Sequence, residues 1–162
     1  MPCNPARIVC NNAPMHPTPD SPASTVFSWP IRVYWEDTDA GGIVFYANYL
    51  KYFERARTEW LRALGLEQGV LQQDTGCIFV VSEANIKYLC PARLDDQLLV
   101  TAQLSDMGRS SFTIRQEARL QEQTGDATGK LLCSGSVRIG WVKHQTMTPA
   151  RIPPLIQDAL KR

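Results

Sequence analysis

The chain has 162 residues, which suffices for one domain with a workable core but leaves little room for two independent domains. Acidic and basic residues nearly balance at a formal net charge of +1, so no overall field attracts nucleic acid or an anionic membrane surface. No apolar stretch reaches the roughly 18 residues of a membrane-spanning helix. Composition therefore excludes a helical membrane protein and a protein whose binding depends on net charge.

The first 25 residues have a composition of their own. Six of the eleven prolines fall within the first 22 residues, and few residues there could pack into a core. These prolines also interrupt any apolar segment of the length that a secretory signal needs. We predict a disordered Pro-rich leader over residues 1–25, a folded domain over residues 26–162, and a cytoplasmic location. The leader is either a short recognition tail or an extension without a function.

A strand is predicted at the start of the domain, from about Val26. Apolar side chains alternate with polar ones there, which is the period of a half-buried strand, at Ile31, Val33 and Trp35. A turn rich in Asp and Gly follows at residues 37–42. This turn separates the strand from the next predicted element.

One long helix is predicted over residues 47–64. Its apolar side chains recur at three- and four-residue spacings, at Leu50, Phe53, Ala56, Trp60 and Leu64. Gly65 stands just beyond, where a helix often ends in a left-handed residue. Glu54 and Arg57 have the spacing of a solvated ion pair on the helix surface.

After this helix, everything up to the C-terminal segment is predicted to be strand. Four segments with alternating apolar residues follow the helix, at residues 78–88, 98–104, 112–120 and 131–141. Four long strands in succession favour an antiparallel sheet, and their length indicates a sheet curled around another element. Only the helix is large enough to fill that role. The sequence predicts an α+β fold, a curved antiparallel sheet wrapped around one long central helix, with a short helix within residues 152–160.

Few side chains can carry covalent or metal chemistry. The two histidines are His16, in the leader, and His144, near the end of the last strand, so neither a Ser-His-Asp triad nor a His-rich zinc site has a basis. No two of the five cysteines form a C-x-x-C pair, and Cys133 lies in an apolar run where a thiol usually behaves as a small hydrophobic side chain. We expect no metal, no cofactor, and carboxylates as the catalytic groups.

Acidic residues concentrate at Glu36, Asp37 and Asp39, between the first strand and the helix. Two interpretations of this pattern stay open. In the first, the aspartates only form the turn, because Asp bonds its own backbone well. In the second, the free N–H groups at the start of the helix polarise a carbonyl oxygen, and an acid a few residues upstream acts on the same carbon.

Two segments carry a resemblance to a known family. They are VYWEDTDAGGIVFYANYL at residues 33–50, continued by ERARTE at 54–59, and YLCPARLDD at 88–96. These segments closely resemble the 4-hydroxybenzoyl-CoA thioesterase family and, within it, the Tol-Pal-associated acyl-CoA thioesterase branch. The resemblance covers about residues 28–155.

The resemblance implies a hotdog fold that assembles as a homodimer or a pair of dimers, with active sites at the subunit interface, and that hydrolyses an acyl-CoA thioester to free acid and CoA. It implies that Asp39 is the catalytic carboxylate, either as the nucleophile that forms an acyl-enzyme anhydride or as the base that activates water. The backbone N–H near Tyr46 matches the position that polarises the thioester carbonyl, typically worth about 3 kcal/mol of barrier. Many members of the nearest branch have His in place of Tyr46, whereas the 4-hydroxybenzoyl-CoA enzyme has Tyr.

Four further residues are expected to contact the substrate. Gly42 lets the backbone approach a ligand closely, and Asn48 belongs to the first motif, at the start of the helix. Arg109 and Ser110 lie where the family places a basic cluster against the CoA nucleotide. Arg109 either pairs with a phosphate or is an ordinary solvated turn residue.

Other readings remain beside the thioesterase. A non-catalytic binding module for acyl-CoA or an acyl carrier protein, active in envelope or lipid metabolism, would keep Arg109 and the groove without needing Asp39. A hotdog dehydratase would pair a His with an acid, and no His is near. Glu54 and Glu59 are alternative catalytic acids, because a related hotdog branch places its carboxylate on the helix.

Overall fold

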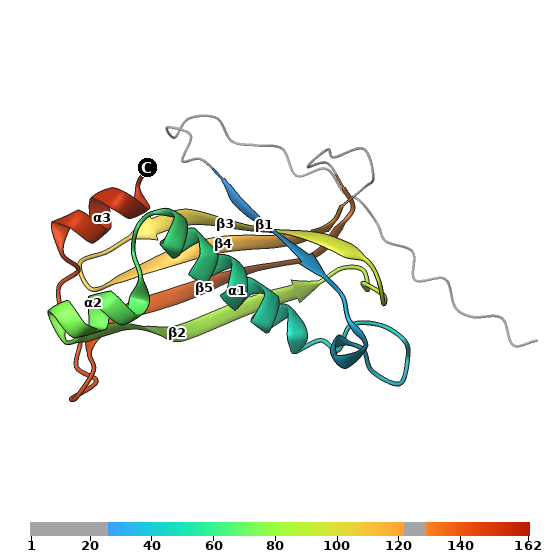
Figure 1. Cartoon of the computed structure of the whole chain (residues 1–162), viewed down its shortest axis with the longest axis horizontal. Coiled ribbons are helices and arrows are strands. Elements are labelled where there is room, and N and C mark those ends of the chain that lie inside the picture. Colours follow the sequence, from blue (N-terminus) through green and yellow to red (C-terminus); the bar gives the residue numbers. More distant parts are fainter. Residues whose placement is uncertain (1–25, 122–128) are drawn as a thin grey trace, which may run out of the picture.

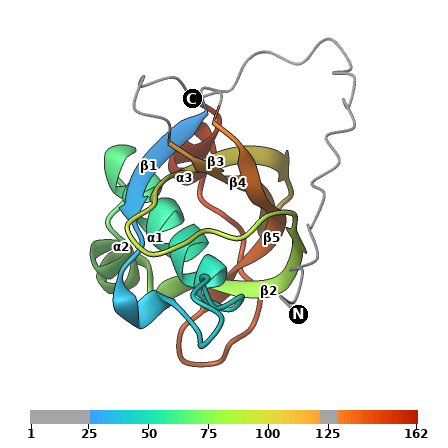
Figure 2. The same cartoon turned by 90° about the vertical axis from the view of Figure 1, so that its right-hand side faces the viewer.

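The computed structural model describes residues 26–121 and 129–162, so the predicted leader lies outside the described residues. Five antiparallel strands form one sheet in the order β1-β3-β4-β5-β2, with the bounds β1 Phe27–Arg32, β2 Cys77–Tyr88, β3 Gln97–Met107, β4 Ser111–Leu120 and β5 Leu131–Lys143. The helices are η1 (a 3-10 turn) Trp35–Asp37, α1 Asn48–Ala63, α2 Gln68–Thr75 and α3 Pro154–Leu160. Helix α1 crosses the sheet (Figure 1), and seen end-on the strands curl around it (Figure 2). The predicted α+β architecture is confirmed.

Helix α1 forms because one side of it is apolar along its whole length. The residues at its buried positions follow three- and four-residue steps, namely Tyr49, Tyr52, Phe53, Ala56 and Trp60. The helix ends as predicted at Gly65, whose φ of 76° is left-handed. The Leu66 N–H then donates to the Leu61 carbonyl at 2.8 Å, which closes the last turn.

The strands turn alternate side chains toward α1. Leu98, Val100 and Ala102 of β3 are fully buried, and β4 and β5 repeat the pattern. Gly135 of β5 is required by this packing, since a Cβ there would lie 3.2 Å from the Phe53 ring and 2.8 Å from the Asn85 carbonyl oxygen. Close approach of α1 to the sheet therefore depends on a residue without a side chain.

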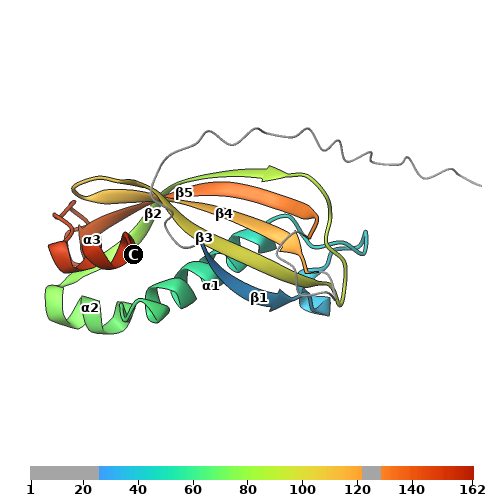
Figure 3. The ribbon, with the colours of Figure 1, turned by 90° about the horizontal axis from the view of Figure 1, so that it is seen from above.

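The buried side chains form two apolar clusters along α1. The first surrounds the N-terminal half of the helix and includes Tyr52 and Phe53. The second surrounds the C-terminal end and includes Trp60, Trp141 and Ile156, the last of these from α3. Helices α2 and α3 both lie at this second end, whereas the start of α1 is close to η1 and the loop that follows it (Figure 3). Among the described residues, no helix is long and apolar enough to cross a membrane.

Three local predictions are wrong. Trp35 does not extend the first strand: it lies in η1 with 78% of its surface exposed, because the chain leaves the sheet after Val33. Helix α2 was not expected, since its polar sequence has no apolar periodicity. Arg57 is not a solvated partner of Glu54, because it is only 9% exposed and donates to Gln116 Oε1 at 2.8 Å.

Candidate active site

The segment between η1 and α1 folds as a closed loop over residues 37–45. Thr38 and Val44 form an isolated antiparallel bridge, and the Asp39 N–H donates to the Ile43 carbonyl at 2.9 Å. The Gly42 N–H donates to the Asp39 carbonyl at 3.0 Å, with Gly42 at a φ of 71°. The loop tip therefore has one defined conformation, which requires glycine at position 42.

Asp39 lies at the exposed tip of this loop. Its Oδ1 accepts a hydrogen bond from the Gly41 N–H at 2.8 Å, so the turn-forming interpretation of this residue describes its geometry. A Cβ at position 41 would lie 3.1 Å from the same oxygen. Oδ2 has no hydrogen bond with the described part of the chain. One carboxylate oxygen is thus held in place while the other is available.

Asp37 has the opposite environment. It is only 4% exposed, and its Oδ2 accepts from the Tyr34 N–H at 2.9 Å. Its backbone carbonyl accepts from the Phe45 N–H at 2.9 Å and from Nδ2 of Asn48 at 3.0 Å. A carboxylate buried in this way cannot reach a substrate, so the two aspartates of the motif are not interchangeable.

The start of α1 presents unpaired amides. No side chain caps the helix, whose N-cap is Ala47. The N–H groups of Tyr46 and Ala47 have no acceptor among residues 26–121 and 129–162. The Ala47 N–H lies at the positive end of the helix dipole and the Tyr46 N–H one residue before it, so both suit a developing negative charge on oxygen.

An apolar hollow of about 310 Å³ adjoins this helix start. It is lined by Ile43, Val44, Tyr46, Tyr49, Tyr88, Leu89, Cys90 and Pro91. The Tyr88 ring makes an edge contact with Tyr46 at 6.2 Å and a tilted contact with Tyr49 at 5.8 Å between centroids. Asp39 is not among the lining residues, so within one chain its carboxylate lies beside the hollow rather than in it.

Two tyrosines beneath the hollow are held in the neutral form. Burial raises the pKa of Tyr49 to about 12, and the Tyr49 hydroxyl accepts from the Ala92 N–H at 3.0 Å. Burial, with a further contribution from the negative charge of Asp37, raises the pKa of Tyr52. The Tyr52 hydroxyl is fully buried and has no hydrogen bond of normal geometry with the residues that the structure describes. Neither phenol is accessible enough to act on a substrate.

The predicted substrate-contacting residues do not all come together. Gly42 is on the loop tip, and Asn48 is buried with its amide nitrogen bonded to Asp37. Arg109 and Ser110 lie in the turn that follows the C-terminal end of β3. The N-terminal end of β3 lies near the 37–45 loop, where the Val33 N–H donates to the Asp96 carbonyl. Eleven residues of strand separate these ends, roughly 35 Å. In Figure 1 the loop is at the right and this turn at the left.

Sequence reasoning missed several residues near the predicted sites. Tyr88 opens the second family motif, but its place in the hollow, beside Tyr46 and Tyr49, was not expected from the sequence. Arg138 of β5 donates to the Ser111 hydroxyl at 3.2 Å, which places a second guanidinium at the first residue of β4 after the turn that holds Arg109. No sequence signal pairs these residues, because the β4–β5 register sets their proximity.

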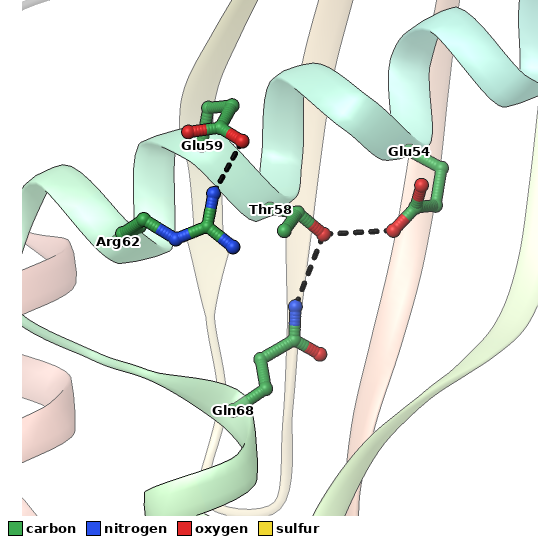
Figure 4. Close-up of polar contacts among 5 residues, drawn as sticks. All are labelled: Glu54, Thr58, Glu59, Arg62 and Gln68. Carbon is green, nitrogen blue, oxygen red and sulfur yellow. Dashed lines mark hydrogen bonds and ion pairs between the residues drawn. The ribbon is translucent and has the colours of Figure 1, made fainter.

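The helix acids have local partners. Glu54 accepts from the Thr58 hydroxyl at 2.7 Å, and Gln68 of α2 donates to the same hydroxyl at 3.1 Å. Glu59 pairs with Arg62, one turn further on (Figure 4). These contacts give each acid a structural role and leave open the alternative that one of them is catalytic.

Cysteine and metal chemistry find little support in the described residues. Cys133 is a fully buried free thiol, as its apolar run predicted, and burial raises its pKa to about 12. Within the described part of the chain, no three His, Cys, Asp or Glu side chains gather closely enough to hold a metal ion. Carboxylates and backbone amides are the reactive groups that the loop end presents.

Comparison with known proteins places this geometry in a family. Residues 41–127 match the family described as the Thioesterase superfamily. The acyl-CoA thioesterase YbgC of Haemophilus influenzae is 41% identical over 133 residues, which cover 82% of this chain and 93% of that protein. The acyl-CoA thioester hydrolase YbgC of Escherichia coli is 37% identical over 139 residues, 86% of this chain and 98% of that one.

Solved structures share the fold. A probable thioesterase from Bartonella henselae superposes with a TM-score of 0.72 at 29% identity, over 80% of this chain and 100% of that one. A 4-hydroxybenzoyl CoA thioesterase variant complexed with 4-hydroxybenzoyl CoA gives a TM-score of 0.77 at 19% identity, over 83% and 98% of the two chains. The sheet curled around α1 is accordingly a hotdog fold, and the chain belongs to the thioesterase superfamily.

Proposed function

We propose that this protein is an acyl-CoA thioesterase, which hydrolyses an acyl-CoA thioester to free acid and CoA. The observation that carries the proposal is the single loop over residues 37–45, which bears the available Asp39 carboxylate oxygen and leads directly into the unpaired amides of Tyr46 and Ala47. The apolar hollow beside the amides suits an acyl group. Relatives at 37–41% identity that are named acyl-CoA thioesterases or thioester hydrolases support this substrate class.

The proposed mechanism divides the work between the two groups. The thioester carbonyl oxygen accepts from the N–H groups of Tyr46 and Ala47, which polarise it and stabilise the oxyanion as it forms. Asp39 either attacks the carbonyl carbon to form an anhydride that water then hydrolyses, or removes a proton from the attacking water. In the first route the CoA thiolate leaves as the anhydride forms, and hydrolysis of the anhydride releases the acid and restores the Asp39 carboxylate. In the second route the C–S bond breaks after water adds, and Asp39 returns to a carboxylate by passing its proton to the departing thiolate.

The substrate-contacting roles of Gly42, Asn48, Arg109 and Ser110 remain predictions. Arg109 lies too far from Asp39 to serve the same active site within one chain, so its contact with the CoA nucleotide requires a second subunit. Arg138 strengthens this part of the proposal by adding a guanidinium beside the same turn.

We infer a homodimer or homotetramer formed at the β2 edge. Strand β2 is 12 residues long and lies at the edge of the sheet, so among residues 26–121 and 129–162 one row of its backbone groups faces no neighbouring strand. Val81 in its middle is 54% exposed and lines a hollow of about 550 Å³ against α1, together with Leu50 and Ala84. Light scattering should give at least two chains per particle, and Val81→Asp should shift the protein to monomers.

The remaining parts of the proposal concern the location of the protein in the cell and its protein partners. A cytoplasmic location, an association with Tol-Pal envelope proteins and an acyl carrier protein as an alternative acyl donor all follow from the leader composition and the family resemblance. An acyl carrier protein partner is tested by comparing thiol release from the same acyl group on CoA and on the carrier.

The deciding experiment is a substrate panel. Free thiol release is measured with acyl-CoAs from short to long chain and one aromatic thioester. Hydrolysis of at least one substrate, abolished by Asp39→Asn, is the expected outcome. Tight binding of acyl-CoA without thiol release from any substrate would replace the thioesterase with a binding module.

A further inference from the structure

The geometry points to Asp37 as a positioning residue, which together with Tyr34, Phe45 and Asn48 forms a clamp that holds the Asp39 loop against the start of α1. We call these four residues the Asp37 clamp. This inference rests on the proposed function, because it concerns the relative placement of the two groups that the mechanism uses.

The clamp joins three segments through one residue. The Asp37 carboxylate accepts from the Tyr34 N–H at 2.9 Å, and the Asp37 N–H donates back to the Tyr34 carbonyl at 3.1 Å. The Asp37 carbonyl accepts from the Phe45 N–H at 2.9 Å, at the far end of the loop, and from the Asn48 amide at 3.0 Å, in the first turn of α1. The chain before the loop, the base of the loop and the helix start are thereby tied together.

Burial makes these bonds costly to lose. Asp37 and Asn48 are 4% and 5% exposed, so water cannot replace their partners. The Tyr52 hydroxyl is also fully buried, and the negative charge of Asp37 helps to raise the pKa of Tyr52. The clamp therefore has few alternative arrangements.

The position of the clamp explains what it controls. Asp39 lies two residues after Asp37 on one arm of the loop, and Tyr46 lies one residue after Phe45 on the other. A shift at the loop base moves the carboxylate relative to the amides, and misplacement by about 1 Å can cost on the order of 100-fold in rate. Asn48, expected from the motif to contact substrate, acts in this inference through Asp37 instead.

Three variants separate the parts of the clamp. Asp37→Ala removes the bond from Tyr34, and Asn48→Ala removes the donor to the Asp37 carbonyl. Both should lower kcat about 10-fold or more while KM changes less than about threefold, since both side chains are buried and neither lines the apolar hollow. Asp37→Asn retains an oxygen that can accept from Tyr34 and should recover most of the kcat lost in Asp37→Ala.

A matched control accounts for lost stability. Ile156→Val shortens a buried side chain in the cluster at the far end of α1 and should lower the unfolding midpoint without changing kcat per folded molecule. If the activity that a clamp variant loses is fully explained by its fraction of unfolded protein, as expected for Ile156→Val, the positioning role is overturned. A folded Asp37→Ala with the kcat of the wild type would overturn it as well.

Hydrogen exchange tests the clamp independently of activity. In Asp37→Ala and Asn48→Ala, the amide protons of Asp39, Gly42 and Phe45 should exchange faster, whereas those in the middle of α1 should not. If the wild type hydrolyses no thioester, the proposed function fails, and this exchange pattern still decides whether the clamp holds the loop. If exchange accelerates but kcat stays at the wild-type value, the positioning inference alone fails.

Discussion

The two ends of α1 are built differently. At its start the backbone is held by buried polar groups, chiefly Asp37 and Asn48, and it presents an exposed carboxylate and unpaired amides. At its far end the helix is enclosed by aromatic and aliphatic side chains, including Trp60 and Trp141, with α2 and α3 beside them. The start places a carboxylate oxygen and unpaired amides beside an apolar hollow, whereas the interior of the far end is filled by apolar side chains.

This difference suggests a division between function and stability. An apolar core accepts exchanges between apolar side chains of similar volume, but it loses stability when side-chain volume is removed. A polar loop end contributes less burial but fixes the direction of individual groups. Substitutions at the two ends should therefore separate catalysis from folding.

The largest effect is expected at Asp39. Asp39→Asn removes the carboxylate but can retain the turn, because an amide oxygen can also accept from the Gly41 N–H. Thiol release should fall by about 10² to 10⁴ with the unfolding midpoint almost unchanged. Glu36→Gln, at a neighbouring exposed acid, is the control and should retain activity. Retained activity in Asp39→Asn would remove this residue from the catalytic role.

The opposite result is expected at Trp141. This side chain is 1% exposed and packs on Phe79 with centroids 4.6 Å apart. Trp141→Ala should cost about 3 to 5 kcal/mol of unfolding free energy, measured by urea denaturation, with normal kcat per folded molecule. If stability is too low to assay, Ile156→Val should show the same separation at about 1 kcal/mol. A specific loss of kcat in the folded fraction would break the division between the two ends.

Alkaline pH should weaken the loop end through Tyr49. Its pKa is about 12 in the fold against an ordinary value of 10.0, with burial as the main cause. The stabilisation is complete below pH 10, where both states are protonated. As pH rises from 10 toward 12, the unfolding free energy falls by about 2 to 3 kcal/mol, because the unfolded chain releases the Tyr49 proton first. Unfolding free energies between pH 9 and 11.5 measure this loss.

Tyr49→Phe checks the assignment of that loss. This variant lacks the titrating proton, so its unfolding free energy should fall less steeply over the same pH range. At neutral pH it should be less stable than the wild type by about 1 to 3 kcal/mol, because the Ala92 N–H loses its acceptor. Equal alkaline slopes for the two proteins would assign the loss to other groups.

The smallest effect is expected at Arg109. If its guanidinium meets the CoA nucleotide of a site completed by another subunit, Arg109→Ala should raise KM by roughly 10-fold at low salt and leave kcat unchanged. Arg138→Ala should act in the same direction. A KM equal to that of the wild type in both variants would leave the far end of α1 with structural roles only.

Much of the fold follows from local patterns. The helical period over residues 47–64 and the alternation in the four later strands do not depend on distant contacts, and the structure confirms both. Helix α2 has no such pattern, since none of its residues is buried and its sequence is mostly polar. Trp35 continues the alternation of the first strand, but the sequence does not reveal that the chain has already left the sheet.

The candidate site was only partly predictable for the same reason. The acidic Gly-rich turn and the helix start after it are adjacent in sequence, so their proximity could be expected. Tyr88 and Arg138 come from distant strands. Tyr88 reaches the hollow through ring contacts with Tyr46 and Tyr49, and the β4–β5 register brings Arg138 beside Ser111.

The sequence by itself determined the order of elements, the closing glycine of α1 and the place of the acidic loop, since each depends on residues within a few positions of one another. Tertiary structure alone decided which aspartate is buried and which is free. Asp37 and Asp39 are two residues apart and chemically identical, and they differ because the Tyr34 N–H and the packed side chains around Tyr52 surround only the first. Burial is a property of what packs around a residue, and that information is spread across the whole chain.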